Sequence, residues 1–309
     1  MSHAHEHEHA PQGGRALIIT LVITVVFMVT ELVGGLLSGS LALVGDAGHM
    51  LVDVLALGLS LFAAYLARRP STLSRTFGYH RVEIMAALAN GSVLVLVSAF
   101  IFFEAADRFR SPPEVKTPLM ITIAVIGLLA NIAGILVLRR SSGTSLNLRG
   151  AFFHVLGDAM SSVGVIIAGI IIAATGWTAA DPVVAVIIGI IILWGSVRLV
   201  RDSVDILMEA APKNINAEAV VGVLKKISGV EEIHDIHIWT ITSGIVALSA
   251  HLMIADQMVS VSTDVRDSVN RELKEQFGIT HTTLQLESSR CENCPVGMVC
   301  QLTRPEEED

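Results

Sequence analysis

The chain has 309 residues, of which 52% are hydrophobic and only 16% are charged, with a formal net charge of −8 and a mean hydropathy of +0.64. Soluble domains carry about 25% charged residues, so this composition favours a membrane protein. The negative net charge argues against a nucleic-acid-binding protein, which requires a basic surface.

The N-terminal arm, residues 1–15, alternates histidine with other residues at His3, His5, His7 and His9. Histidine-rich tracts are typical metal-binding segments. We predict a cytoplasmic arm that collects metal loosely, and the alternative is a solvated tail that binds nothing.

Residues 16–210 contain six long apolar stretches, and a membrane helix needs about 20 such residues. We predict an α-helical membrane domain with six transmembrane helices, because buried helices of a soluble protein would not give six successive runs. The stretches are 16–37, 41–67, 82–109, 118–138, 148–175 and 182–207.

Lysine and arginine are distributed unevenly between the two sides of the predicted membrane domain. They concentrate before the first stretch, in the second and fourth connections and after the sixth stretch, and they are few on the other side. Short cytoplasmic loops carry the excess of Lys and Arg. We therefore expect a multi-pass protein of the plasma membrane with both termini in the cytoplasm.

Two of the stretches contain a histidine four residues before an aspartate, as His49 and Asp53 and as His154 and Asp158. Ionisable residues inside the membrane are costly and usually functional. At this spacing both side chains lie on one helical face, one turn apart. Two such faces would offer two imidazole nitrogens and two carboxylates, which suits tetrahedral Zn²⁺. Ca²⁺ and Mg²⁺ instead prefer six or more oxygen ligands.

The depth of the two pairs agrees with a shared site. At about 1.5 Å per helical residue, Asp53 and Asp158 both fall near the middle of a bilayer core of about 30 Å. We predict that the four residues form one transport site, and the alternative is two unrelated pairs that hydrogen-bond other helices. Glu31 and Asp46 are further acidic residues in these stretches, and each is a candidate gate, a proton relay or a structural contact between helices.

Residues 211–289 have a different, soluble composition. Their pattern predicts a small α+β domain in the order helix, strand, strand, helix, strand. The predicted segments are 216–227, 230–241, 245–254, 262–277 and 282–286.

This predicted domain contains the candidate metal ligands His234, His237, His251, His281 and Glu287. Residues two apart on a strand share a face, so ligands from neighbouring strands can converge. The alternative is that each histidine is merely a solvated polar residue.

An acidic tail, residues 290–309, contains Cys291 and Cys294 with C-x-x-C spacing. In a reduced compartment this spacing favours a zinc-binding pair over a redox motif. The alternative is a tail without a ligand.

Four motifs together resemble the cation diffusion facilitator family, near its zinc-exporting members. The first is Ser40-Leu-Ala-Leu-Val-Gly-Asp46-Ala-Gly-His49-Met-Leu-Val-Asp53, and the others are Thr76-Phe-Gly-Tyr-His-Arg81-Val-Glu83, His154-Val-Leu-Gly-Asp158 and His234-Asp-Ile-His-Ile-Trp239. The resemblance extends over nearly the whole chain.

The resemblance implies a homodimer through the membrane and C-terminal domains, a ferredoxin-like (metallochaperone-like) C-terminal domain, and exchange of metal for protons. It assigns the transport ligands to His49, Asp53, His154 and Asp158. Members that look manganese-selective typically have Asp at the first position, so His49 favours zinc.

The resemblance also implies a binuclear zinc site at the dimer interface, near His237, His251, His281 and Glu287. Gln285 stands where some members have His, so one of the two metals is expected to bind more weakly.

We therefore predict a secondary-active efflux transporter that exchanges Zn²⁺ for H⁺ by alternating access, and not an enzyme. A membrane-bound metal sensor without transport is the alternative, while a zinc protease would require His-Glu-x-x-His on one helix. The sequence does not rank zinc against Cd²⁺, Co²⁺ or Ni²⁺, which accept the same mixed ligands. Near the domain junction, Arg81 is expected to pair with Asp205 or Glu209.

Overall fold

The computed structural model describes residues 12–67, 69–141 and 146–289, and the chain separates into two compact units. The helical unit comprises residues up to Phe62 together with Ala86–Val200. The C-terminal unit comprises Ala63–Met85 and the residues from Arg201 onward, so it includes the connection between the second and third helices.

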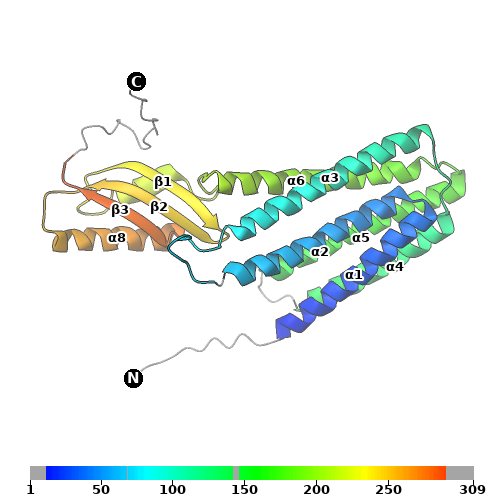
Figure 1. Ribbon diagram of the computed structural model, residues 1–309, viewed down its shortest axis with the longest axis horizontal. Helices are drawn as coiled ribbons and strands as arrows, with labels where there is room; N and C mark the ends of the chain where they lie inside the picture. The colour runs from blue at the N-terminus through cyan, green and yellow to red at the C-terminus, as the bar shows by residue number, and fades with distance from the viewer. Residues whose placement is uncertain (1–11, 68, 142–145, 290–309) are drawn as a thin grey trace. The chain divides into compact units, whose positions relative to one another are not determined.

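Six long helices carry the six apolar stretches predicted from the sequence (Figure 1). Their bounds are α1 Gln12–Ser38, α2 Leu41–Ala67, α3 Val82–Arg110, α4 Thr117–Ser141, α5 Leu146–Thr175 and α6 Ala180–Leu207.

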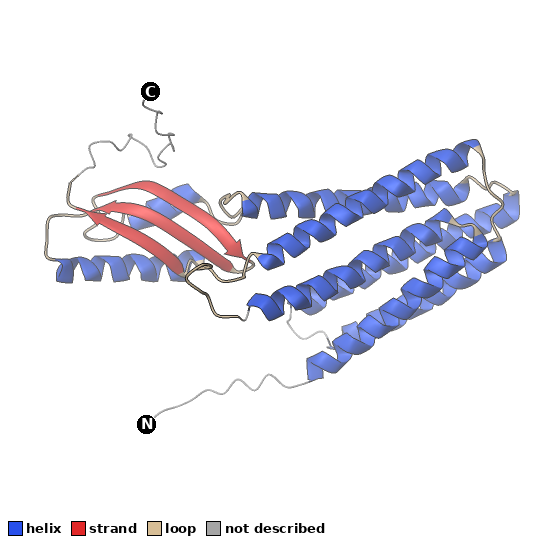
Figure 2. Cartoon of the chain, in the orientation of Figure 1, coloured by secondary structure: helices blue, strands red, loops and turns tan. Residues whose placement is uncertain are grey.

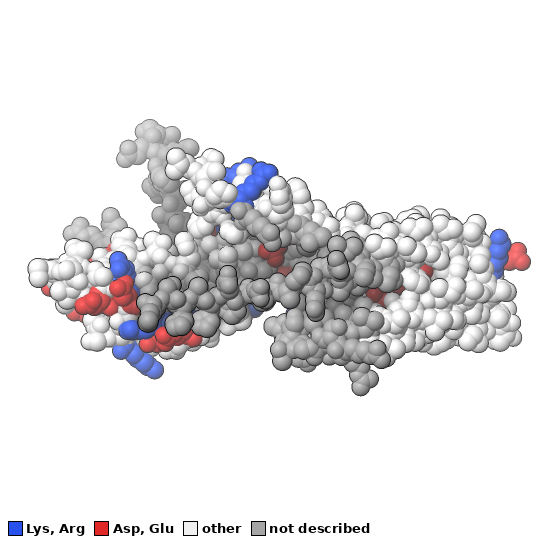
Figure 3. All heavy atoms as spheres, turned by 90° about the horizontal axis from the view of Figure 1, so that it is seen from below, with Lys and Arg blue, Asp and Glu red and all other residues white. Residues whose placement is uncertain are grey.

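Among the described residues, four of these helices contain segments long and apolar enough to cross a membrane, in α3, α4, α5 and α6. Shorter apolar segments lie in α1, at Thr24–Ser38, and in α2, at Leu41–Val52. Large apolar side chains such as Leu96, Phe103 and Trp194 point outward from the helical unit. Figure 3 shows few charged groups on the face of these helices that is in view. This surface is typical of a domain surrounded by lipid.

Close approach of α4 to its neighbours depends on two glycines. A Cβ at Gly34 of α1 would lie 2.0 Å from the Ile123 side chain of α4, and one at Gly169 of α5 would lie 2.5 Å from Ile121. Small residues at such positions allow membrane helices to pack tightly. The packing holds α1, α4 and α5 together.

Asp181, at the start of α6, caps the start of α2. The first amides of a helix have no partner within it. Here the Leu41 and Ala42 amides donate to the Asp181 carboxylate at 2.6 and 3.2 Å, and the Ser40 hydroxyl donates at 2.5 Å. Asp181 is fully buried and lies 3.6 Å from Arg108 of α3. The helix that carries His49 is therefore anchored at its first turn.

The C-terminal unit contains three strands in one sheet, seen as adjacent arrows in Figure 2, with the order β1-β2-β3. β1 and β2 form an antiparallel hairpin, and β3 pairs with β2 in parallel. Asn216 caps α7 by accepting a hydrogen bond from the Ala219 amide at 3.1 Å. The elements are α7 Ala217–Leu224, β1 Glu232–Thr242, β2 Ile245–Met253, α8 Val259–Phe277 and β3 His281–Glu287, in the predicted order.

One face of this sheet packs against α7 and α8 through a core that includes Leu224, Leu248, Leu252, Val269 and Leu273. Alternate residues of β2 and β3 point to the other face, which we call the open face. The histidines predicted as ligands lie on β1, β2 and β3, so the alternation along each strand decides which of them share a face.

Candidate metal centres

In the helical unit, α2 and α5 bring polar residues together at two successive levels. Ser161 Oγ of α5 donates a hydrogen bond of 2.7 Å to Asp46 Oδ1 of α2. Three residues further along α2, His49 Nε2 lies 3.9 Å from Oδ1 of Asp158, which is three residues earlier in α5. The two helices therefore run antiparallel, with His49 level with Asp158.

Asp53 and His154 belong to the same two helices, each about one turn from the His49 and Asp158 contact. Their side chains lie outside the part of the chain whose side chains the structure describes. Of the four predicted transport ligands, the described side chains are thus His49 and Asp158, and these two lie close together.

Glu31 of α1 is buried close to these residues. Its carboxylate occupies the space beside Gly127 of α4, where a Cβ would lie 2.6 Å from Glu31 Oε1 and 3.6 Å from Ser162 Oγ. Asp46 and Asp158 are its acidic neighbours. Glu31 and Asp46, for which the sequence left a gate, a proton relay or a structural contact open, therefore lie in one polar region with Asp158.

On the sheet, a β-bulge in β1 determines which residues reach the open face. The register shifts between His234 and His237, and Asp235 within the bulge has a φ of 49°. Ile233 and Ile236, which flank the bulge, both pack into the core. A regular strand would place His234 and His237 on opposite faces because they are three apart. The bulge instead lets both avoid the core face.

His234, His251 and Glu287 form a compact group of potential metal ligands, which we call the sheet triad. His234 pairs with His251 across the hairpin, and Glu287 lies two residues beyond the β3 partner of His251. Glu287 contacts His234 Nε2 at 3.2 Å and His251 Nδ1 at 3.0 Å. One ligand atom from each residue lies within 4.8 Å of the others.

The donors of the sheet triad fit a zinc ion. Both ring nitrogens of His234, Nδ1 of His251 and Oε2 of Glu287 are buried and have no hydrogen-bond partner among the described residues. The close contacts of these atoms are therefore with one another and not hydrogen bonds, and buried polar atoms in this state are costly, which points to a ligand between them. Two imidazoles and one carboxylate are common protein ligands of Zn²⁺.

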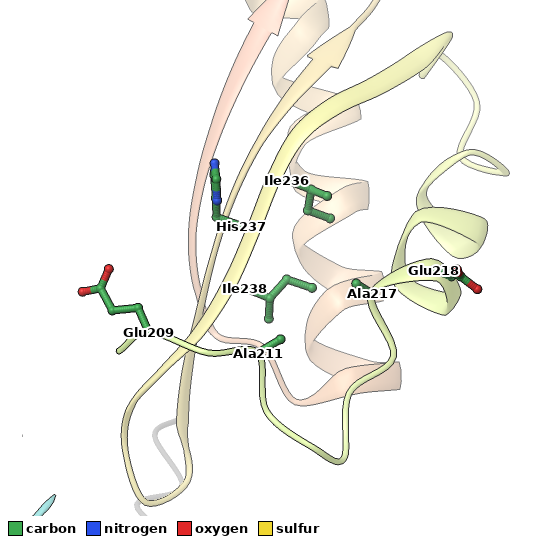
Figure 4. Close-up of a pocket in the computed structure, with 7 residues that line it drawn as sticks. All are labelled: Glu209, Ala211, Ala217, Glu218, Ile236, His237 and Ile238. Carbon is green, nitrogen blue, oxygen red and sulfur yellow. The ribbon is translucent and has the colours of Figure 1, made fainter. Parts of the chain in front are cut away.

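Asp235 connects the sheet triad to His237. Its two carboxylate oxygens lie 3.0 Å from His237 Nε2 and 3.7 Å from His251 Nε2. Figure 4 shows the His237 side chain on the opposite side of β1 from Ile236 and Ile238. Of these two contacts, the one to His237 is a hydrogen bond, which is the kind of contact by which carboxylates orient metal-binding histidines. His234 was among the candidate ligands predicted from the sequence, whereas Asp235 was not, because the bulge that places it has no clear sequence signal.

The remaining predicted ligands lie elsewhere. His281 begins β3 opposite Ala247, six residues before Glu287, and at about 3.3 Å per residue this separates them by about 20 Å. Its ring instead contacts Phe77 edge to face, with centroids 5.7 Å apart. Within one chain His281 therefore does not join the sheet triad. Cys291 and Cys294, and also His3, His5, His7 and His9, lie outside the described residues.

Within the C-terminal unit, Arg81 contacts Glu209 at 2.7 Å. Asp205 instead lies 3.4 Å from Lys213, which also contacts Asp202. Hydrogen bonds to Asp202 and Asp205 raise the pKa of Lys213 above its ordinary value. The predicted partner of Arg81 was Asp205 or Glu209, and the structure places Glu209 there.

A second contact of this segment involves Glu83 at the start of α3. Its carboxylate accepts hydrogen bonds from Thr242 Oγ1 and Ser243 Oγ at the β1–β2 turn, at 2.6 and 2.8 Å. No local sequence signal indicates this contact, because it joins residues that are 159 and 160 positions apart.

Comparison with known proteins covers nearly the whole chain. Residues 17–208 match the cation efflux transmembrane domain, and residues 212–289 match the cytoplasmic domain of cation efflux proteins. A cadmium, cobalt and zinc/H(+)-K(+) antiporter of Bacillus subtilis is 41% identical over 290 residues, covering 93% of each chain.

Two further relatives show the same extent of similarity. The zinc transporter ZitB of Escherichia coli is 40% identical, covering 94% of this chain and 93% of its own. The metal cation efflux system protein CzcD of Cupriavidus metallidurans is 39% identical, with 94% and 92% covered. A solved structure of the metal-bound C-terminal domain of CzcD is 33% identical and covers 24% of this chain and 99% of its own, with a TM-score of 0.22.

Proposed function

Since the chain belongs to the cation efflux family, we propose that it exports divalent metal cations, zinc foremost, from the cytoplasm in exchange for protons. The similarity extends over more than nine tenths of the chain and of each relative named above. All three relatives are named as transporters or efflux proteins of metal ions, and the names of two of them include zinc.

The proposed substrate site consists of His49, Asp53, His154 and Asp158. The observation that carries it is the antiparallel register of α2 and α5, in which His49 lies level with Asp158. Continuing this register by four residues along each helix would set position 53 level with position 154. Both His-x-x-x-Asp pairs would then border one region between the two helices.

Two imidazoles and two carboxylates provide a mixed donor set that suits zinc in tetrahedral geometry. Cd²⁺, Co²⁺ and Ni²⁺ accept similar ligands, so they are alternative substrates. The Bacillus subtilis relative is named for cadmium and cobalt as well as zinc.

Exchange for protons follows from the chemistry of these ligands. Imidazole and carboxylate bind either H⁺ or a metal ion, so metal binding releases protons and protonation releases metal. His154 is the proposed proton carrier because imidazole titrates near neutral pH. A site that opens alternately to each side would load metal from the cytoplasm and release it outside.

The proposed assembly is a homodimer of six-span chains in the plasma membrane, with both termini in the cytoplasm. The predominance of Lys and Arg in the connections on one side supports this orientation. The order of strands and helices in residues 212–289 supports a ferredoxin-like fold for the cytoplasmic domain.

In the cytoplasmic domain, we propose that the sheet triad binds a resident zinc ion, with Asp235 orienting the adjacent His237. His237, His281, Cys291 and Cys294 are proposed as ligands of further cytoplasmic metal ions. The histidines of the N-terminal arm are proposed to collect metal loosely. The contact between Arg81 and Glu209 supports a role in holding the α2–α3 connection to the end of α6.

Purified protein in proteoliposomes tests transport against the alternative of a metal sensor. The wild type is expected to take up zinc and to move protons in the opposite direction. Asp158→Ala should abolish both fluxes, whereas Asp107→Ala, which removes an exposed carboxylate at the end of α3, should retain them. Zinc binding without any flux in the wild type would favour the sensor.

A further inference from the structure

The connection between α2 and α3 contains arginines that lack acidic partners. Residues 63–82 include four arginines and no aspartate or glutamate. Of these arginines, Arg81 contacts Glu209. In the described parts of the chain, Arg69 and Arg75 contact no carboxylate, and both are exposed. This segment therefore carries positive charge that the chain itself does not neutralise.

Tyrosine rings hold both of these guanidinium groups. The guanidinium of Arg69 lies 5.8 Å from the centroid of the Tyr65 ring, and that of Arg75 lies 4.5 Å from the centroid of the Tyr79 ring. Cation–π contacts form at such distances. A guanidinium stacked on a ring keeps N–H donors at its edge, and these donors match the oxygens of a phosphate group. Both arginines are therefore oriented to bind phosphate.

Between the two arginines, a tight turn exposes a leucine. Thr72 and Arg75 exchange two backbone hydrogen bonds, of 3.2 and 3.0 Å, which close the turn around Leu73. The Leu73 side chain is fully exposed, and large parts of Tyr65 and Phe77 are exposed as well. One exposed leucine is common on a protein surface. Apolar and aromatic side chains that alternate with arginines are instead typical of a surface that contacts the membrane interface.

An apolar stripe along α2 leads directly to this segment. Leu55, Leu59 and Phe62 are exposed and follow one another at intervals of four and three residues, so they lie on one face of the helix. Tyr65 extends this stripe by three residues. Arg69 lies two residues beyond the end of α2, which is at most about 7 Å further along the chain. A stripe that ends in a tyrosine and an arginine is typical of a membrane helix that ends among lipid headgroups.

We propose that Arg69 and Arg75 bind the headgroup of an anionic phospholipid, with Leu73 inserted beside its acyl chains. This inference rests on the proposed orientation, which places the α2–α3 connection at the cytoplasmic leaflet, where anionic lipids attract arginines next to a membrane helix. Charge complementarity favours an anionic over a zwitterionic lipid, because the two arginines have no acidic partners. Continuity with the stripe on α2 favours a lipid over a soluble phosphate, because acyl chains would cover the stripe and Leu73.

Native mass spectrometry of the full-length protein, titrated with phosphatidylglycerol or phosphatidylcholine, tests the site directly. The wild type should bind phosphatidylglycerol at least about tenfold more tightly than phosphatidylcholine. Arg69→Gln combined with Arg75→Gln should remove this preference. Arg110→Gln, which removes an exposed arginine at the other end of α3, is the matched control and should retain it. Equal affinity of the wild type and the double variant for phosphatidylglycerol would overturn the proposal.

Two further measurements distinguish a lipid from a soluble anion. Glycerol phosphate at millimolar concentration should not displace the bound lipid, because it lacks acyl chains; displacement would identify a site for soluble anions and overturn the proposal. In vesicles of phosphatidylglycerol with brominated acyl chains, the fluorescence that Leu73→Trp adds to the wild-type signal should be quenched. Unquenched fluorescence would contradict insertion of the turn. Neither measurement requires zinc uptake, so a failure of the proposed export and a failure of the lipid site are separate results.

Discussion

The helical unit and the sheet both assemble histidine and carboxylate ligands, but they position them in different ways. On α2 and α5, ligands four residues apart share a face because of local helical geometry alone. On the sheet, His234 and His251 meet through strand pairing, and Glu287 joins them from a third strand. A helical ligand pair can therefore be recognised from spacing, whereas a sheet site depends on register.

The largest expected effect concerns the helical site. Asp53→Ala or His154→Ala should lower zinc flux in proteoliposomes more than about 100-fold, because even residues that only orient metal ligands contribute 10–100-fold. The double variant should lose little more than either single variant if both residues belong to one site. Independent, additive losses would indicate that the two pairs do not act together.

The sheet triad gives the next largest effect. In the full-length Asp158→Ala background, His234→Ala should weaken zinc binding about 100-fold or eliminate one equivalent, because a direct ligand is lost. His281→Ala should leave that equivalent unchanged, since His281 lies at the opposite end of β3. Isothermal titration measures both. If the His281 variant loses the same equivalent, that histidine reaches the triad from a second copy of the chain.

The contrast between the two regions also explains which parts of the fold were predictable. The six helices follow from apolar composition, and the strands follow from alternation, because both signals are local. The β1–β2 register is not local. Thr242 pairs with Ile245, and an uninterrupted hairpin would set Ile236 opposite His251. Two register shifts bring His234 there instead, and neither could be predicted from the sequence.

Contacts between distant residues were missed for the same reason. Asp181 caps a helix that begins 140 positions earlier, and nothing in the sequence around it indicates this partner. Glu31 and Asp46 were recognised as buried acidic residues, but their convergence with Ser162 depends on packing around Gly127.

Substitution of one ligand of the helical site should alter the metal selectivity of transport more than the stability of the protein. His49→Asp replaces an imidazole with a third carboxylate, which favours harder ions such as Mn²⁺. The ratio of zinc to manganese uptake should fall about tenfold, measured in competition assays with vesicles. An unchanged ratio would remove the reason for assigning zinc preference to His49.

The smallest expected effect concerns the cap of α2. Asp181→Asn removes the charge that accepts hydrogen bonds from three donors, so the free energy of unfolding should fall by about 1–3 kcal/mol. Asp107→Asn, which alters an exposed carboxylate, should leave it unchanged. Denaturant unfolding of the full-length protein in detergent measures the difference. Equal stability of the two variants would show that the cap contributes little.

X-ray absorption at the zinc edge tests the central proposal most directly, because it reports the ligands of the transported ion. The full-length protein would carry His234→Ala, Cys291→Ala and Cys294→Ala and would be loaded with one zinc ion per chain, so that the cytoplasmic sites contribute little. We predict two imidazole nitrogens and two oxygens at about 2.0–2.2 Å, with one imidazole lost in either His49→Ala or His154→Ala. A spectrum that keeps both imidazoles in both variants would contradict the site formed by α2 and α5.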